Sequence, residues 1–221
     1  MEDNTAKGML TILNVILFTV PLVSILFATI YIYNSAEFIE LLVSQPIKRS
    51  KIWISLFISL SLSLIISFLI GSGIPLLINA PDFNGIMMLI IGVLITAIFV
   101  SLAFFSAIFN RDKARGIGTS IVIWLFFALI FDGLILFLLF QFSDYPIEKP
   151  MIFITSLSPI DLARIQMLLH LDASAMMGYT GALFKEYFGN GIGIAVSLLL
   201  LLLWVIIPFV LSLKKFKTKD L

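Results

Sequence analysis

The sequence has no cysteine and a single histidine, and these two absences exclude several kinds of site. Without cysteine, neither a disulfide framework nor a thiolate metal site can form. His170 alone cannot supply a site built from several imidazoles. Charge is also scarce, since 12% of the 221 residues are charged and 61% are hydrophobic. This balance is far from that of a soluble globular domain.

Catalytic motifs are missing as well. The sequence contains no glycine-rich phosphate loop, no His-Glu metalloprotease motif and no Gly-x-Ser-x-Gly elbow. Adjoining apolar segments do not carry paired carboxylates. We therefore expect a non-catalytic chain that binds no cofactor of its own.

Five long apolar runs dominate what is present, and each has at least 23 residues. A helix rises about 1.5 Å per residue, so roughly 20 residues cross the hydrocarbon core of a bilayer. In lipid, a lone apolar segment satisfies its backbone groups only as a helix. The sequence predicts an all-α, polytopic membrane protein whose residues 1–221 form one domain. The predicted spans are 9–33, 53–78, 86–108, 117–141 and 191–213.

The basic residues alternate from side to side. Ten of the 14 fall in the connection between spans one and two, in that between spans three and four, and in the C-terminal tail. Basic residues favour the cytoplasmic side. We therefore expect a cytoplasmic C-terminus and an N-terminus outside. The ten are Lys48, Arg49, Lys51, Arg111, Lys113, Arg115, Lys214, Lys215, Lys217 and Lys219.

The cytoplasmic segment 34–52 has the pattern of a short amphipathic helix. It is expected either to lie on anionic lipid headgroups or to dock onto a cytosolic partner. The apolar residues of this segment, Phe38, Leu41 and Leu42, recur at helical spacing and share one face. The acidic residues Glu37 and Glu40 lie off that face.

The outer region 142–190 is the largest part outside the predicted spans. Ser158, Pro159 and Asp161 supply a cap, a first-turn proline and a first-turn acid, which together predict a helix start. A second, weaker helix is expected at 173–184. These helices could cap the bundle, lie on the outer leaflet or bind an extracytoplasmic partner.

Asp132 is the one ionisable residue deep within a predicted span. A carboxylate there costs about 2.5–3.5 kcal/mol on insertion scales and is a functional candidate. The structural alternative is a carboxyl group that is protonated or hydrogen-bonded to a neighbouring helix.

Span two carries small residues at every fourth position, namely Ser55, Ser59, Ser63, Ser67 and Gly71. Such spacing allows close helix packing, with a polar translocation path as the alternative. In the outer region, Met167, His170, Met176 and Met177 are weak candidates for contact with a soft copper ion, although methionine is also ordinary apolar filling.

Three stretches resemble a known family. Residues 36–57 (AEFIELLVSQPIKRSKIWISLF) are similar to the coupling segment of ABC-2 type transporter permeases, in which an acidic, leucine-rich stretch precedes a Ser-x-Pro-x-x-Arg turn. Residues 109–136 (FNRDKARGIGTSIVIWLFFALIFDGLIL) and 157–169 (LSPIDLARIQMLL) resemble the NosY-type branch, which serves nitrous-oxide reductase maturation. Members have six spans, so the resemblance implies that the family's first span is absent from this chain.

The resemblance also implies partners. Such a permease forms a homodimer in the bacterial inner membrane and engages a cytosolic ABC ATPase, which binds the ATP and magnesium. An extracytoplasmic β-helical accessory protein sits on the outer surface, and the complex supports copper-site assembly. Membrane lipids are expected partners and nucleic acid is not. Glu37, Phe38, Glu40, Leu41 and Leu42 would form the ATPase-coupling helix, and Pro159, Asp161 and Arg164 the outer partner contact.

Two other functions stay open. The chain could be an ABC-2 permease that exports a different substrate, such as a lipid, peptide or drug. It could also be an intramembrane enzyme that uses Asp132, which would require a second essential titratable residue within the spans.

Overall fold

The computed structural model of the chain describes residues 2–79, 81–142, 148–170 and 191–218. The regular structure in these ranges is helical, and they contain no strand. The all-α prediction is therefore confirmed.

Five helical stretches in the described ranges are long and apolar enough to cross a membrane. Their positions match the five predicted spans to within a few residues at most boundaries, because length and apolar character alone define them. They are α1 (Glu2–Asn34); α3 (Arg49–Phe68) with η1 (Leu69–Gly73) and α4 (Ile74–Asn79); α5 (Phe83–Phe109); α6 (Lys113–Leu125) with η2 (Phe126–Ile130) and α7 (Phe131–Gln141); and α11 (Gly191–Thr218).

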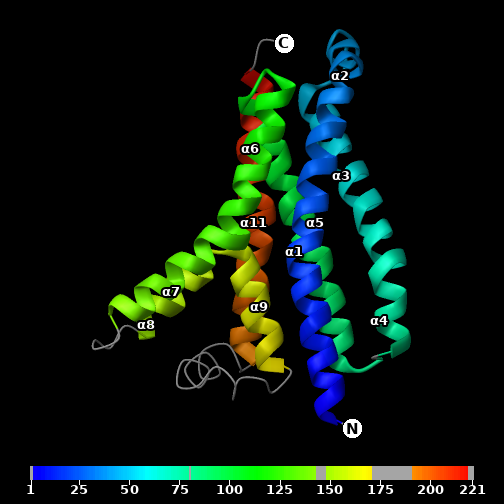
Figure 1. The fold of residues 1–221 in the computed structure, drawn as a ribbon. Helices are drawn as coiled ribbons and strands as arrows, with labels where there is room; N and C mark the ends of the chain where they lie inside the picture. Colours follow the sequence, from blue (N-terminus) through cyan, green and yellow to red (C-terminus); the bar gives the residue numbers. More distant parts are fainter. Residues whose placement is uncertain (1, 80, 143–147, 171–190, 219–221) are drawn as a thin grey trace.

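Two of the spans contain a π-helical turn, η1 and η2, which the apolar pattern did not predict. A π turn breaks the regular i to i−4 hydrogen bonds and can redirect the helix. Figure 1 shows that α7 leaves the bundle at a steep angle after η2, whereas α6 stays beside its neighbours. The fourth span is thus bent immediately before Asp132.

Helix α5 forms the centre of the bundle and packs against α1, α3, α6, α9 and α11. Of its apolar window, 67% is buried, against 17% in each of the spans that contain α3, α6 and α11. Close approach needs small residues: a Cβ on Gly92 would overlap the ring of Phe68 from α3. The outer spans keep wide exposed apolar faces, as membrane helices do.

An aromatic cluster joins three of these helices. The ring of Trp53 stacks on Phe216 at a centroid distance of 4.3 Å and meets Phe104 edge-on at 4.8 Å. The indole nitrogen of Trp53 donates to Ser212 Oγ at 3.0 Å, so its polar end is satisfied. The cluster fixes the first turns of α3 against α5 and the last turns of α11.

Shorter helices complete the described part: α2 (Ala36–Val43), α8 (Glu148–Ser156) and α9 (Pro159–His170). Helix α9 begins where the sequence predicted, and Ser158 Oγ accepts the backbone N–H of Asp161 at 3.3 Å. It packs against α1, α5 and α11, so it is part of the bundle and does not lie on an outer surface. The second predicted outer helix, 173–184, lies outside the described residues.

The antiparallel order of the spans gathers the basic residues at one end of the bundle. Helix α2, the start of α6 and the end of α11 lie there, and the N-terminus, α4 and the end of α9 lie at the other (Figure 1). We call the first the basic end. Its described basic residues are Lys48, Arg49, Lys51, Arg111, Lys113, Arg115, Lys214, Lys215 and Lys217.

Candidate functional site

Helix α2 lies at the basic end and is held there by apolar side chains, of which Val43 packs against the core. Ile39 is 5% exposed and joins the core. The backbone turns from α1 into α2 within one residue. The amide of Ser35 donates to the carbonyl of Tyr31, and the amide of Ile39 donates to the carbonyl of Ser35, at 2.9 Å each. After Val43, Ser44 Oγ donates to the carbonyl of Leu41 at 2.7 Å, and the helix ends before Pro46.

The residues expected to couple to an ATPase are mostly exposed on α2, and one of them, Glu40, also lines the cavity behind the helix. Glu37 and Glu40 are exposed, and the large apolar side chains of Phe38 and Leu41 are 57% and 65% exposed. Leu42 is half-buried. The side chains of Phe38 and Leu41 therefore remain largely uncovered by the rest of the chain and are available to a partner.

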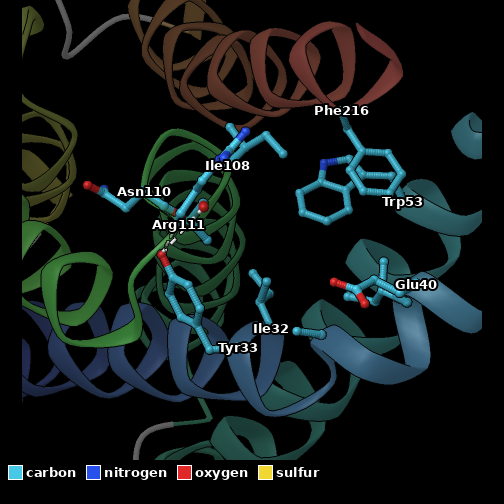
Figure 2. Close-up of a pocket in the computed structure, with 11 residues that line it drawn as sticks. Ile32, Tyr33, Glu40, Trp53, Ile108, Asn110, Arg111 and Phe216 are labelled. Atoms are coloured by element: carbon cyan, nitrogen blue, oxygen red, sulfur yellow. Dashed lines mark hydrogen bonds between the residues drawn. The ribbon is translucent and has the colours of Figure 1, made fainter. Parts of the chain in front are cut away.

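A cavity of about 500 Å³ lies behind α2, at the meeting point of the helix ends. Figure 2 shows Glu40 on one side of it and Arg111 on another, and the rings of Trp53 and Phe216 form an aromatic wall of the same cavity. The remaining lining residues are Ile32, Tyr33, Ala36, Ile39, Ala107, Ile108 and Asn110. The sequence did not predict this cavity, because its walls come from five separate segments.

Tyr33 ties the end of α1 to the turn between α5 and α6. Its hydroxyl donates to the carbonyls of Asn110 at 3.1 Å and Ala107 at 3.4 Å, two groups near the end of α5 that a helix leaves unpaired. The ring lies so close to Gly116 that a Cβ there would overlap it. Asn34 Oδ1 also accepts a hydrogen bond from Lys113 Nζ at 2.7 Å. One wall of the cavity is therefore firmly placed.

The small residues of span two face away from the chain's own core. Ser55, Ser59, Ser63, Ser67 and Gly71 are all exposed. Ser55 and Ser59 line a groove of about 360 Å³ that α3 forms with α1 and α2. The stripe therefore makes no close helix seam within the described part of this chain. A seam with another chain and a polar path both remain open.

The carboxylate of Asp132 pairs with an arginine from the outer region. Arg164 Nη1 lies 2.8 Å from both Asp132 oxygens and 3.2 Å from Asp161 Oδ1. Asp161 is 3% exposed, and its Oδ2 has no partner among the described residues. Burial, and after it the neighbouring carboxylate of Asp132, raise the pKa of Asp161 to about 7. We call these three residues the charge cluster.

The charge cluster changes the interpretation of the outer residues. Pro159 and Asp161 are buried within the chain, and Arg164 is half-buried against Asp132. On the next turn, Ser197 Oγ of α11 donates to Gln166 Oε1 of α9 at 2.6 Å. These contacts hold α9 between the spans, so Asp161 and Arg164 have roles inside the chain before any partner is considered.

The comparisons with known proteins identify the family. Residues 3–221 match the family described as "ABC-2 family transporter protein". The chain belongs to this family. It is also 27% identical over 173 residues to a protein of Pseudomonas aeruginosa named "Probable ABC transporter permease protein NosY". That match covers 73% of this chain and 63% of the relative, so the chain spans less than two thirds of the relative's length.

The five apolar spans agree with membership of this transporter family. The described residues contain no group of three histidine, aspartate or glutamate side chains that could hold a metal ion. Of the four weak copper candidates, Met167 is fully buried in the core, and Met176 and Met177 lie outside the described residues. His170 ends α9, and the position of its side chain is not among the described features.

Proposed function

We propose that this permease transmits the work of a cytosolic ABC ATPase across the membrane, with α2 as the coupling helix. The observation that carries the proposal is the exposed coupling face, in which Phe38 and Leu41 project from a helix that Ile39 anchors to the core. Exposed aromatic and aliphatic side chains flanked by carboxylates are suited to a hydrophobic groove with a basic rim.

The basic end faces the cytoplasm in this proposal, as its Lys and Arg residues favour. ATP-driven closure of the ATPase pair pushes α2 toward the bundle. The ends of α1 and α3 that flank α2 pass the movement to α5, against which both helices pack. No ATP site is required in this chain, and the magnesium nucleotide stays with the partner.

Copper-site maturation of nitrous-oxide reductase is the specific process we propose, because the chain resembles NosY-type permeases. A second copy of the permease and an extracytoplasmic β-helical protein complete the complex in this proposal. The exposed small-residue stripe of α3 is a natural face for the second copy. Export of a lipid, peptide or drug by another ABC-2 complex is the alternative.

The test is reconstitution of the full chain in lipid nanodiscs with an ABC ATPase subunit from the same organism. The permease alone is expected to hydrolyse no ATP, and the ATPase is expected to bind it and to change its turnover on binding. Co-purification of a β-helical protein would favour the maturation complex. An ATPase whose binding and turnover ignore the permease would contradict the coupling function.

A further inference from the structure

The cavity behind α2 presents two opposite charges that are not paired with each other. Glu40 and Arg111 both line it, and Figure 2 shows their side chains separated by the open space. Within the described part of the chain, neither side chain forms an ion pair or a hydrogen bond. The neighbouring polar groups are already engaged: Asp112 Oδ1 accepts the amide of Arg115, and Tyr33 donates to two carbonyls.

The cavity lies at a defined level of the bundle. Its walls are α2, the last turns of α1 and α11, the first turns of α3, and the end of α5 with the residues that follow it. In a chain whose spans match the hydrocarbon core, span ends lie in the headgroup layer, where tryptophan is also enriched. Trp53 and Phe216 line the cavity at this level.

We propose that this cavity binds a phospholipid headgroup that carries both a phosphate and a primary ammonium group. Arg111 binds the phosphate, since its guanidinium suits phosphate oxygens. Glu40 accepts hydrogen bonds from the ammonium group. Ile32, Ile39 and the aromatic wall contact the glycerol and the first methylene groups. A cavity of about 500 Å³ is within the usual size range of small-molecule sites.

The two charges predict a ranking among lipids. A phosphatidylglycerol satisfies Arg111 but leaves Glu40 without a cation, and its net negative charge is repelled by that carboxylate. A phosphatidylcholine carries a cation, but its three methyl groups leave no N–H to donate. Phosphatidylethanolamine satisfies both residues. The inference shares Glu40 with the predicted coupling helix but does not require ATPase docking, because it requires only that the basic end lies in the headgroup layer.

Native mass spectrometry of the full chain provides the test. The protein is exchanged into an equimolar mixture of phosphatidylethanolamine, phosphatidylcholine and phosphatidylglycerol with the same acyl chains, and retained lipid is counted. We expect retained phosphatidylethanolamine to exceed either other lipid by at least about fivefold, as one additional charge-assisted hydrogen bond allows. Equal retention of the three lipids by the wild-type chain would overturn the proposal, and this arm needs no variant.

Variants then assign the two charges. Glu40→Gln is expected to remove most of the preference over phosphatidylglycerol, and Arg111→Gln to lower retention of all three lipids. Arg115→Gln is the matched control, because Arg115 lies four residues further along, in the first turn of α6, and does not line the cavity. An effect of Arg115→Gln as large as that of Arg111→Gln would show nonspecific attraction by the basic end and contradict the site.

A final arm distinguishes the lipid from a soluble zwitterion. Free phosphoethanolamine is added at the concentration of the lipid, and retained lipid is counted again. The lipid site predicts little displacement, because the free molecule lacks the groups that contact Ile32, Ile39 and Trp53. Complete displacement at equal concentration would identify a soluble ligand and overturn the lipid assignment.

Discussion

Arg164 of α9 places one guanidinium nitrogen 2.8 Å from both carboxylate oxygens of Asp132 on α7. The two residues lie 32 positions apart and connect the bent part of the fourth span to a short helix inside the bundle. The ion pair explains how a carboxylate is tolerated in an apolar span: its charge is matched by the nearest cation.

The first prediction concerns this ion pair. Arg164→Gln should lower stability more than Asp132→Asn, because losing the arginine leaves two carboxylates facing each other. Both side chains are about one-third exposed (31% and 34%), so we expect a coupling energy of only about 1 kcal/mol. Thermal unfolding of the two single variants and the double variant in detergent measures it. Strictly additive losses would show that the ion pair contributes nothing.

The second prediction is a pH dependence that comes from Asp161. Its pKa is raised from 3.8 to about 7 by burial and the neighbouring Asp132, with Arg164 acting in the opposite direction. The unfolded chain therefore loses this proton first, near pH 4, and the folded chain keeps it until about pH 7. The contribution of Asp161 to the free energy of unfolding is therefore largest below about pH 4. It decreases as the pH rises from about 4 to about 7 and is constant above about pH 7.

Thermal midpoints measured from about pH 5 to about pH 8 test this slope. Asp161→Asn should flatten it, because the amide does not titrate. Glu37→Gln is a suitable control, since this exposed carboxylate at the basic end lies far from the charge cluster. If wild type and Asp161→Asn follow the same curve, Asp161 does not titrate in this range.

The third prediction concerns helix packing around Tyr33. Gly116→Ala should destabilise the chain by about 1–3 kcal/mol, because the new methyl group overlaps the tyrosine ring. Gly118→Ala on the same helix should be neutral or stabilising by up to about 1 kcal/mol, since no atom lies within 4 Å of a Cβ there. Chemical or thermal unfolding compares them. Equal effects of the two substitutions would show that the contact between Tyr33 and Gly116 is unimportant.

The fourth prediction addresses coupling. Leu41→Asp should lower the affinity for the ATPase by about tenfold or more, because it places a charge in the centre of an exposed apolar face. The spans should remain folded, since Leu41 is not part of the core. Gln45→Asp adds the same charge at an exposed position just beyond α2 and serves as the control. Equal ATPase binding by wild type and Leu41→Asp would exclude this face.

Much of the fold could be predicted from the sequence. The five spans follow from apolar length, and the start of α9 at Pro159 follows from local capping chemistry at Ser158. The π turns could not be predicted, because apolar residues suit an α-helix and a π turn equally. The small-residue stripe was recognised, but which neighbour it faces depends on tertiary packing.

Among the candidate sites, those within one segment could be predicted from the sequence, and those that combine distant segments could not. The coupling residues were predicted from the spacing of Phe38 and Leu41 within one segment, and the structure leaves both side chains exposed. The charge cluster and the cavity were missed, because each combines residues that are distant in the chain. One signal was available for the cluster: Asp132 is a lone acid in a span, and Arg164 is one of the few cations predicted on its side. Opposite charges in an apolar setting favour pairing.

The proposed coupling requires the basic end to face the cytoplasm, and thiol labelling measures this orientation directly. The chain has no cysteine, so single cysteines can be introduced without background: Leu41→Cys on α2 and Asp82→Cys at the opposite end. A membrane-impermeant maleimide added to intact spheroplasts should label the cysteine at 82 and reach that at 41 only after lysis. Labelling of the cysteine at 41 in intact spheroplasts would place α2 outside the cytoplasm, where no ATPase could reach it, and would contradict the proposed coupling.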